Sequence, residues 1–494
     1  MTKFYITTAI DYVNAEPHVG HAYEKIIADA LARWHRLKGD DVFFLTGTDD
    51  NAGKNDEAAK KSKTPVREFV DRNSKKFVEL CKKLNLSNDD FIRTTEERHV
   101  KIAREIFERV YSKGDVYKGE YEGLYCKGCE SFYTEKELVD GKCPEHHTKP
   151  EYIREETYFF KLSKYKNDII NLIEKDNLIE PIEWRNEVLS RLKNEDLKDL
   201  SITRLNQSWG IKTPIDSKHT IYVWFEALIS YYSATREKGR ENYWPADVHL
   251  IGKGINWFHS VIWPGILFSA GIKQPKKVLV HGYLTVNGQK IGKSLGNVID
   301  PIHLIDKYGV DALRYFLLRE IPLGQDGDFS EEALKARING ELANDLGNLV
   351  SRILSIAEKK LNGKVSSKSF LEKSSQKVDK KLAEKLDLKK IENLIEKYEL
   401  HNALAEIFRF VNECNKHVND EKPWQLEGKE LEEHLYTLLE AIRIISILVS
   451  SFIPETSSKI NKQLGIKDGL LKDCKFGIVN EYNVKKGEIL FKKV

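Results

Sequence analysis

The fold class is indicated most clearly by residues 3–46, KFYITTAIDYVNAEPHVGHAYEKIIADALARWHRLKGDDVFFLT. Residues 3–10 are rich in β-branched and aromatic side chains and predict a strand. Apolar residues then recur at helical spacing from Pro17 to Gly39, and we expect Pro17 in the first helical turn, where its missing N–H needs no partner. Residues 42–46 predict a second strand. Strand, helix and strand in this order indicate a βαβ unit of a doubly wound parallel sheet.

More strands of this kind are predicted downstream, at 220–225 (TIYVWF), 249–252 (HLIG) and 277–282 (KVLVHG). The segment before them, rich in Tyr, Lys, Glu and Gly, predicts an insertion, and the last third of the chain predicts an all-α helical bundle. We therefore expect an α/β chain in five parts: a Rossmann-like catalytic domain in two halves, 1–116 and 217–285, the insertion at 117–216, a loop region at 286–335, and the bundle at 336–494.

The composition excludes several classes of protein. The 494 residues, 41% hydrophobic and 31% charged, are ordinary for a globular chain with several cores. No apolar run approaches the roughly 18 residues of a membrane span, and the N-terminus lacks the features of a signal peptide, so we expect a cytoplasmic protein without membrane contact. The net charge of +3 does not mark the whole chain as a nucleic-acid binder, although its 79 Lys and Arg could form local tracks for phosphates.

The motif His18-Val19-Gly20-His21 lies where the first strand meets the first helix. Ligands of parallel sheets bind beyond the carboxyl ends of the strands, and a helix N-terminus there offers free N–H groups to phosphate. Gly20 would let a flat adenine approach the backbone, and both imidazoles could donate to phosphate oxygens. Taken alone, the motif is equally well explained by a metal pair or a chance surface match.

A second motif, Lys290-Ile291-Gly292-Lys293-Ser294, follows the turn signal Asn287-Gly288. A loop with two lysines can fold over a triphosphate and neutralise charge as pyrophosphate leaves. The alternative is a solvated lysine loop, which is common in Lys-rich proteins.

Together the two motifs resemble the HIGH and KMSKS pair of class I aminoacyl-tRNA synthetases. The stretches TTAIDYVNAEPHVGHAYEKIIADALARWHRLKGDDVFFLTGTD, TIYVWFEALISYY, LIGKGINWFHSVIWPGIL and VHGYLTVNGQKIGKSLGNVIDP are similar, in this order, to methionyl-tRNA synthetases. The resemblance implies a methionine–tRNA ligase. Such an enzyme activates L-methionine with ATP to methionyl-adenylate and pyrophosphate, and then transfers methionine to the 3′ end of tRNA(Met). It also implies that 286–335 includes a tRNA stem-contact region and that the bundle binds the anticodon.

The resemblance assigns the substrate sites as well. Neither step needs a protein nucleophile, so His18, His21, Lys290 and Lys293 would act through position and charge. ATP, with Mg²⁺ on its triphosphate, would contact these four and Gly20, Gly292 and Ser294. Asp49 would pair with the methionine ammonium. A thioether favours apolar and aromatic walls, and the side chain would lie among Ile10, Tyr12, Trp224, Ala227, Tyr231, Ile255 and His259. For most of these residues the alternative is plain core packing.

Four stretches depart from residues that are usual in the family. Ala9-Ile10-Asp11-Tyr12 replaces Pro-Ile-Tyr-Tyr, and Asp50-Asn51-Ala52 replaces Glu-His-Gly. Gly254 replaces Asp, and Ile291-Gly292 replaces Met-Ser. These departures concern substrate contacts and leave the histidines, lysines and Asp49 in place. Met1 is the only methionine, for which drift, adaptation and engineering are alternative explanations.

Cys126-x2-Cys129 and Cys143-x2-His146 form two close pairs of soft ligands. Four such ligands suit one tetrahedral, structural Zn²⁺ per chain, without an open position for catalysis. His147 could replace His146, and the alternative is two unrelated pairs in a reduced core. Similar knuckles occur in the insertion of methionyl-tRNA synthetases, usually with four cysteines.

Asn344, Asn348 and Arg352 lie at i, i+4 and i+8 of a predicted helix, and Trp424 follows Pro423 in a later turn. Amides and a guanidinium can contact base edges, and an indole can stack on an unpaired base. By pattern alone such a face is usually solvated. ANDLGNLVSR and EKPW resemble the family's anticodon-binding elements, which implies that these four residues contact tRNA.

Two rival interpretations are less well supported. A leucyl, isoleucyl or valyl enzyme would need a longer editing insertion, and a cysteinyl enzyme would need an open catalytic zinc site. A non-catalytic paralogue that binds only tRNA or a partner is disfavoured because both motifs and the bundle are intact. We expect a monomer.

Overall fold

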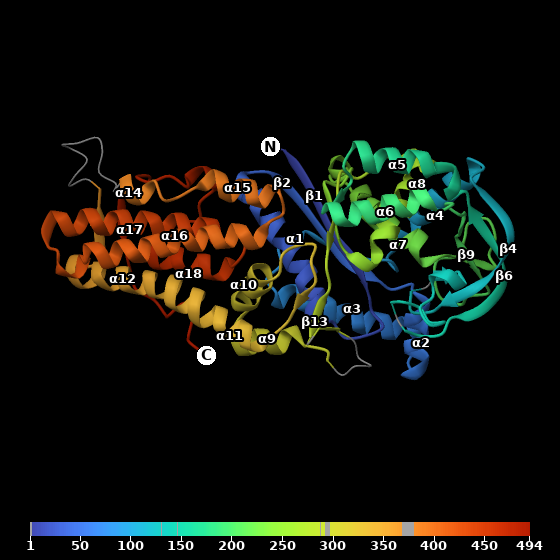
Figure 1. Ribbon diagram of the computed structural model, residues 1–494, viewed down its shortest axis with the longest axis horizontal. Coiled ribbons are helices and arrows are strands. Elements are labelled where there is room, and N and C mark those ends of the chain that lie inside the picture. The colour runs from blue at the N-terminus through green and yellow to red at the C-terminus, as the bar shows by residue number, and fades with distance from the viewer. Residues whose placement is uncertain (1, 130, 146, 287, 292–296, 368–379) are drawn as a thin grey trace.

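The computed structural model describes residues 2–129, 131–145, 147–286, 288–291, 297–367 and 380–494. The molecule is elongated, with an α/β part and a helical bundle lying end to end (Figure 1). In the described residues no helix combines the length and apolarity needed to cross a membrane.

A parallel sheet forms the centre of the α/β part. Its strand order is β3 (Asp90–Arg93), β2 (Asp41–Asp49), β1 (Lys3–Tyr12), β11 (Val248–Gly252), β12 (Val278–His281), β7 (Ile179–Glu180), and every neighbouring pair is parallel. The predicted doubly wound α/β class is confirmed. The strand order reverses between β1 and β11, so the ligand crevice of this fold is expected at their carboxyl ends.

Helix α1 (Val19–Lys38) joins β1 to β2 as predicted, and Gly39 ends it in the left-handed conformation with φ 93°. Its start differs from the prediction. His18 is the N-cap and accepts a hydrogen bond from the Gly20 N–H, so Pro17 precedes the helix instead of lying in its first turn.

The prediction of a strand over residues 220–225 is wrong for most of that segment. Only His219–Ile221 form a strand, β10, which pairs antiparallel with β9 (Thr203–Leu205) outside the parallel sheet. Val223–Ser233 form helix α7, which is buried almost all round. A continuous apolar run does not distinguish a buried strand from a buried helix, because neither shows a polar face.

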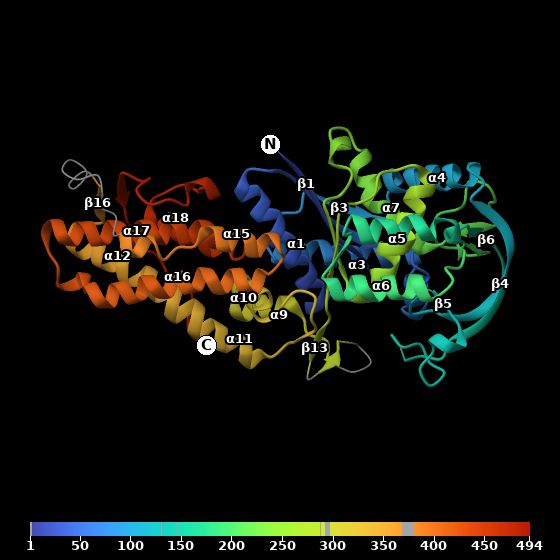
Figure 2. The same ribbon diagram turned by 45° about the horizontal axis from the view of Figure 1, so that its top comes forward.

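The insertion lies at the far end from the bundle (Figures 1 and 2). Its antiparallel sheet contains β5 (Ser131–Tyr133), β4 (Val116–Cys126), β6 (Glu151–Phe160) and β8 (Leu200–Ser201). Helices α5 (Lys166–Lys175) and α6 (Ile182–Asn194) also belong to the insertion.

The other helices of the α/β part are α2 (Gly53–Lys61), α3 (Val66–Lys83), α4 (Glu97–Ser112) and α8 (Trp263–Ala270), in addition to α1 and α7.

Beyond β12 the chain crosses to the bundle. A small sheet is made by β14 (Gln289–Lys290), β13 (Leu284–Val286) and β15 (Gly327–Asp328), and helices α9 (Pro301–Tyr308), α10 (Val310–Glu320) and α11 (Glu331–Arg337) accompany it. The bundle holds α12 (Asn348–Leu361), α14 (Lys380–Ala383), α15 (Leu388–Glu396), α16 (Leu400–Glu421), α17 (Gly428–Val449) and α18 (Pro454–Leu464), with strands β16 (Lys364–Ser366) and β17 (Glu481–Asn483). Ile338–Gly347, ahead of α12, is a π-helix, so the predicted single helix there is divided.

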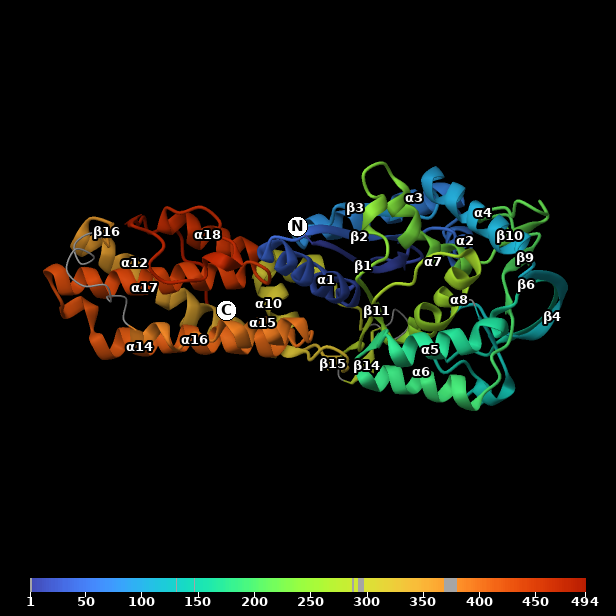
Figure 3. The same ribbon diagram turned by 90° about the horizontal axis from the view of Figure 1, so that it is seen from above.

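Two large hydrophobic clusters cover the two faces of the parallel sheet. One contains Tyr5 and Phe43 and packs on the side of α4, α7 and α8. The other contains Phe4, Phe44 and the apolar face of α1, and continues without interruption into the bundle helices. Seen from above, α1 and α10 lie at the junction of the two parts (Figure 3). The sheet and the bundle therefore share one core.

Arg314 of α10 is fully buried at this junction. Its guanidinium pairs with Asp29 of α1, with Nη2 and Oδ2 2.7 Å apart. It also donates to the carbonyls of Leu84 at the end of α3 and of Ser451 and Phe452 between α17 and α18. One side chain thus connects three elements of different parts of the chain.

Removal of this guanidinium should destabilise the whole molecule. Breaking a buried pair leaves an uncompensated charge and costs about 3–5 kcal/mol, so Arg314→Met should lower the unfolding free energy by that amount in a denaturant titration. Arg154, paired with Glu120 on the exposed insertion sheet, is the control, and Arg154→Met should change stability by less than about 1 kcal/mol. Equal effects of the two substitutions would contradict this role of Arg314.

Candidate active site

A β-bulge in β1 sets which side chains face the ligand crevice. The register with β2 shifts between Thr7 and Ile10, so an extra residue reverses the alternation of faces after it. Ile10 and Tyr12 therefore pack with the α7 cluster, on the side of Tyr5. Without the shift, they would face α1.

All eight residues predicted to bind methionine line one cavity at the carboxyl end of β1. The cavity is bounded by Ala9, Ile10, Tyr12, Asp49, Trp224, Ala227, Leu228, Tyr231, Ile255 and His259. Sequence reasoning missed Ala9 and Leu228, which are direct neighbours of predicted residues. Trp224 stacks on Phe258 with ring centroids 3.9 Å apart, which stiffens one wall.

His259 and Tyr231 form a part of the cavity wall that is polar but uncharged. Nδ1 of His259 lies 2.9 Å from the Ile255 carbonyl, so this nitrogen carries the proton and Nε2 accepts from the Tyr231 hydroxyl, also at 2.9 Å. Burial lowers the pKa of His259 to about 4. The ring is neutral at physiological pH, which suits an uncharged thioether.

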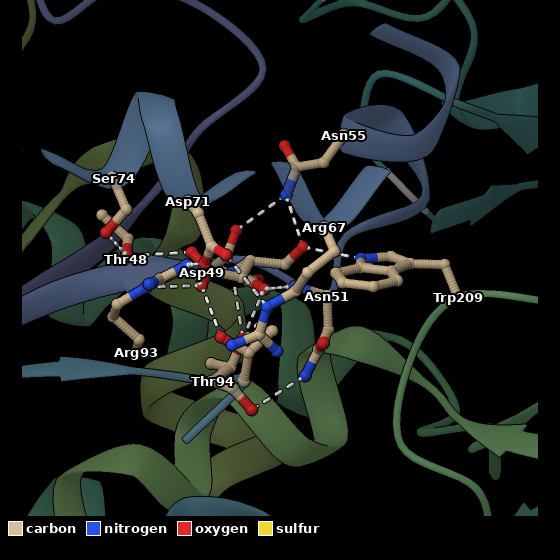
Figure 4. A network of polar contacts seen from close by, with 12 residues as sticks. Thr48, Asp49, Asn51, Asn55, Arg67, Asp71, Ser74, Arg93, Thr94 and Trp209 are labelled. Carbon is tan, nitrogen blue, oxygen red and sulfur yellow. Dashed lines mark hydrogen bonds and ion pairs between the residues drawn. The ribbon is translucent and has the colours of Figure 1, made fainter. Parts of the chain in front are cut away.

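Asp49, at the end of β2, is the acidic group of the cavity and is buried. The Asn51 N–H donates to its carboxylate at 3.2 Å, and the Asn55 side chain donates to its backbone carbonyl at 2.9 Å. Figure 4 shows the surrounding network, which includes Arg93 and Asp71. Arg93 forms ion pairs with Asp71 and with Asp50, the neighbour of Asp49. The turn that carries Asp49 is therefore immobilised before any ligand binds.

Asn51 and Gly254, two residues that are unusual for the family, each have a specific neighbour in the structure. Asn51 donates to Glu226 at 3.1 Å, and Glu226 contacts His99 at 2.6 Å, all three being buried. At Gly254, a Cβ atom would lie 1.9 Å from the Tyr283 hydroxyl. Tyr283 thus occupies the space that a side chain at position 254 would need.

His18 and His21 cap the start of α1 by a reciprocal pair of bonds. Nδ1 of His18 accepts from the Gly20 N–H at 3.1 Å, and Nδ1 of His21 accepts from the His18 N–H at 3.0 Å. An imidazole nitrogen that accepts a hydrogen bond is unprotonated, so each ring carries its proton on Nε2. Burial lowers the pKa of His18 to about 2 and that of His21 to about 3. Two neutral rings therefore present N–H donors.

The start of α1 contacts the segment that follows the lysine motif. The backbone N–H of Val19 donates to the carbonyl of Ile299, just beyond the lysine loop, at 3.0 Å. Strands β13 and β14 lead into the loop, with Lys290 opposite Thr285. Gly292, Lys293 and Ser294 lie outside the described residues, as does the side chain of Lys290.

Cys126, Cys129 and Cys143 form one cluster in which the sulfur atoms lie within 4.8 Å of one another. Thiolates about 2.3 Å from a tetrahedral Zn²⁺ lie about 3.8 Å apart, and Sγ of Cys129 and Cys143 are separated by 3.5 Å. These residues fit the ion. His146 lies outside the described residues, and His147 is not part of the cluster.

The first cysteine turn also contacts the cavity at the carboxyl end of β1. The Trp224 indole N–H donates to the Cys129 carbonyl, and the Lys54 ammonium donates to the Gly128 carbonyl, each at 3.4 Å. Lys54 in turn lies 3.0 Å from the centre of the Tyr12 ring. The knuckle therefore supports two walls of the cavity, which the sequence pattern did not indicate.

In the bundle, the structure brings Arg352 and Trp424 together. The guanidinium lies 5.5 Å from the indole centroid and donates to Asn419 at 3.0 Å. Trp424, in the short turn Pro423–Gln425 after α16, is 41% exposed. Asn344 and Asn348 are exposed as well.

Comparison with known proteins agrees with this arrangement. The family model for class I tRNA synthetases (M) matches residues 4–152 and 146–354, and the model for the anticodon-binding domain of tRNA ligase matches 380–487. The methionine–tRNA ligase of Caldanaerobacter subterraneus subsp. tengcongensis is 45% identical, over 99% of this chain and 79% of that protein. The enzyme of Thermotoga maritima is 44% identical, over 100% and 80%.

The chain belongs to the methionine–tRNA ligase family.

Solved structures of the family have the same fold. Mycobacterium tuberculosis methionyl-tRNA synthetase in complex with methionyl-adenylate is 38% identical, with a TM-score of 0.94 over 99% of this chain and 100% of that one. Its apo form is 36% identical and gives 0.86, over 100% and 98%. The chain is thus similar to the members of this family along both the α/β part and the bundle.

The neutral state of His21 predicts a pH-dependent stability. Its folded pKa, about 3, lies below the ordinary 6.5, so the unfolded chain binds a proton that the folded chain excludes. The stabilising contribution is complete above pH 6.5 and decreases as the pH falls toward 3. His21→Gln keeps a capping-box residue but does not titrate. Between pH 7 and pH 5, wild type should lose roughly 2 kcal/mol more unfolding free energy than this variant.

Denaturant titrations at both pH values measure this difference. The exposed His303 gives the control, and His303→Gln should keep the pH dependence of wild type. If His21→Gln also keeps it, the imidazole is not held neutral by burial.

Proposed function

We propose that this chain activates L-methionine with ATP and transfers it to tRNA(Met), with the site residues predicted from the sequence. The observation that carries the proposal is the single cavity lined by Asp49 and the seven residues assigned to the methionine side chain. Its acid suits an ammonium, and its aromatic and apolar walls suit a thioether. The relatives' names and the adenylate complex support the same reaction.

In the first step, the methionine carboxylate attacks the α-phosphorus of ATP and pyrophosphate leaves. Asp49 would hold the ammonium, so that the carboxylate points out of the cavity toward the start of α1. The Nε2–H groups of His18 and His21 would donate to phosphate oxygens, and Gly20 would leave room for adenine. Preorganised donors of this kind stabilise charge as it develops.

Lys290 and Lys293 would neutralise the leaving pyrophosphate, with Gly292 and Ser294 shaping the loop around it. Mg²⁺ would enter as the counter-ion of the ATP phosphates, where it shields their charge. In the second step the terminal ribose hydroxyl of tRNA attacks the adenylate carbonyl and AMP leaves.

Methionine-dependent exchange of pyrophosphate into ATP tests the substrate assignment. The exchange rate with methionine should exceed that with leucine or cysteine by at least ~100-fold, because branched or short side chains leave the cavity unfilled or clash with it. Asp49→Asn should lower kcat/KM for methionine at least ~10-fold through loss of a charged hydrogen bond. Asp56→Asn, on nearby α2, is the matched control. Faster exchange with leucine or cysteine would overturn the assignment.

We also propose one structural Zn²⁺ at Cys126, Cys129, Cys143 and His146. The ion would cross-link the two knuckle turns, and four protein ligands would leave it no coordination position for substrate. Because the first turn contacts Trp224 and Lys54, the knuckle would also hold two cavity walls in place.

Loss of a knuckle thiol should therefore affect metal content and methionine binding together. Wild type should contain about one zinc per chain by elemental analysis and Cys143→Ala almost none, since a four-ligand structural site loses a ligand. The KM for methionine should rise more than the KM for ATP. Cys414→Ala, a buried thiol of α16, should keep the metal. Zinc-free wild type with full activity would contradict the proposal.

The bundle would bind the anticodon through Asn344, Asn348, Arg352 and Trp424. The contact between Arg352 and Trp424 places a cation beside an exposed aromatic face, which suits an unpaired base. We further propose the five-part division 1–116, 117–216, 217–285, 286–335 and 336–494, with stem contact in the fourth part.

Anticodon binding should be separable from adenylation. Trp424→Ala should lower the rate of tRNA charging at least ~10-fold, because a stacked base contributes about 1–3 kcal/mol. Pyrophosphate exchange should be unchanged. Ile478→Ala, another exposed apolar residue of this part, is the control. Equal loss in both assays would place the defect in folding rather than in tRNA binding.

A further inference from the structure

Asp11 faces away from the methionine cavity. The register shift in β1 turns Ile10 and Tyr12 toward α7, and Asp11 between them faces α1. Its side chain is 8% exposed and forms an ion pair with Lys25 of α1, which is fully buried. The site residues proposed above do not include this pair.

The same carboxylate also faces His21. Lys25 follows His21 by four residues, so both lie on one face of α1. Oδ1 of Asp11 is 3.9 Å from Nε2 of His21, the nitrogen that carries the proton, while Oδ2 contacts the Lys25 ammonium. Asp11 thus lies between a proposed phosphate-binding N–H and a cation.

The negative charge of ATP gives a physical reason for Asp11 and Lys25 to occur together. A carboxylate beside a triphosphate site repels the ligand, most strongly where burial reduces screening. Lys25 compensates this charge. Although burial alone would lower it, the pKa of Lys25 is raised because Asp11 and Glu24 favour the ammonium.

The remaining neighbours are largely occupied by other partners. Glu24 contacts His281 at 3.1 Å, and Asp29, one turn further along α1, pairs with Arg314 and Arg33. His18 is neutral, and the Cys81 thiol on α3 has a pKa raised to about 12 by burial. Among these acids, Asp11 is the one in direct contact with the Lys25 ammonium and the one that raises its pKa most.

We propose that Asp11 and Lys25 form a charge-compensated positioning pair for the ATP phosphates, in which the Asp11 carboxylate acts on the nearby His21 N–H through its charge and Lys25 cancels that charge toward the phosphates. Neither residue touches substrate. The inference rests on the proposed ATP site at His18 and His21, and it adds two residues that are coupled through a charge rather than through a ligand contact.

Binding of two ligands separates a charge effect from a structural one. Calorimetry with the β,γ-methylene analogue of ATP and with adenosine, which lacks phosphates, should be done on wild type, Lys25→Met and Asp11→Asn/Lys25→Met. Lys25→Met should weaken binding of the analogue at least ~10-fold and binding of adenosine less than ~2-fold, because the uncompensated charge of Asp11 repels only phosphates. The double variant should return to within ~3-fold of wild type for the analogue.

Further variants keep the test decisive if Lys25→Met does not fold. Asp11→Asn, which retains the cation, should bind the analogue at least as tightly as wild type but adenylate more slowly, with an unchanged KM for methionine. Arg443→Met breaks a buried pair with Glu440 in the bundle and controls for lost stability, so its affinity for the analogue should stay that of wild type.

Three results would overturn this inference while leaving the proposed ATP site intact. Lys25→Met could bind both ligands equally weakly, or the double variant could bind the analogue as weakly as Lys25→Met does. The third is that Asp11→Asn binds the analogue more weakly than wild type. A wild-type chain without affinity for the analogue would overturn the proposed ATP site, and this inference with it.

Discussion

The buried ion pair between Arg314 and Asp29 is the interaction on which the arrangement of the two parts depends. A guanidinium without water needs all of its partners from the protein, and Arg314 obtains them from α1, from the end of α3 and from the turn between α17 and α18. Arg314 can form this ion pair and these hydrogen bonds only when the bundle is docked in one orientation. Because α1 also carries His18 and His21 at its start, the position of the bundle is tied to the helix that forms the proposed phosphate site.

The substrate sites depend on groups that are fixed before ligands arrive. The two histidines are held in one tautomer by the cap of α1, and the turn after β2 is held by the network around Asp50 and Arg93 (Figure 4). Preorganisation reduces the reorganisation that catalysis would otherwise require. The unusual residues of this chain have local partners: Asn51 contacts Glu226, Tyr283 fills the space beside Gly254, and Asp11 pairs with Lys25.

Part of the fold and of the candidate site could be predicted from the sequence, because local chemistry determines those features. Strand β1, helix α1 and the end of α1 at Gly39 follow from β-branched content, helical spacing and a left-handed glycine. The cavity residues came from family resemblance, and they do converge on one cavity. Other features could not be predicted. The apolar run 220–225 has no polar face, so its change from strand to helix was hidden, and the bulge in β1 leaves no mark in the sequence.

Contacts between distant residues were equally inaccessible. Asp11 and Lys25 belong to different elements, and nothing in the pattern indicates that an acid on a buried strand meets a lysine on a buried helix face. Arg314 resembles an ordinary helical arginine until its carbonyl partners, which are far away in sequence, are known. The contact of the knuckle with Trp224 also depends on how the insertion folds back on the cavity.

In the proposed function, one chain joins a methionine cavity to a tRNA-binding bundle. The most direct test incubates the purified protein with ATP, unfractionated tRNA and each labelled amino acid in turn, and then sequences the charged tRNA. We expect methionine alone to be attached, and only to tRNAs with the methionine anticodon. Attachment of another amino acid, or of methionine to other tRNAs at a similar rate, would contradict it.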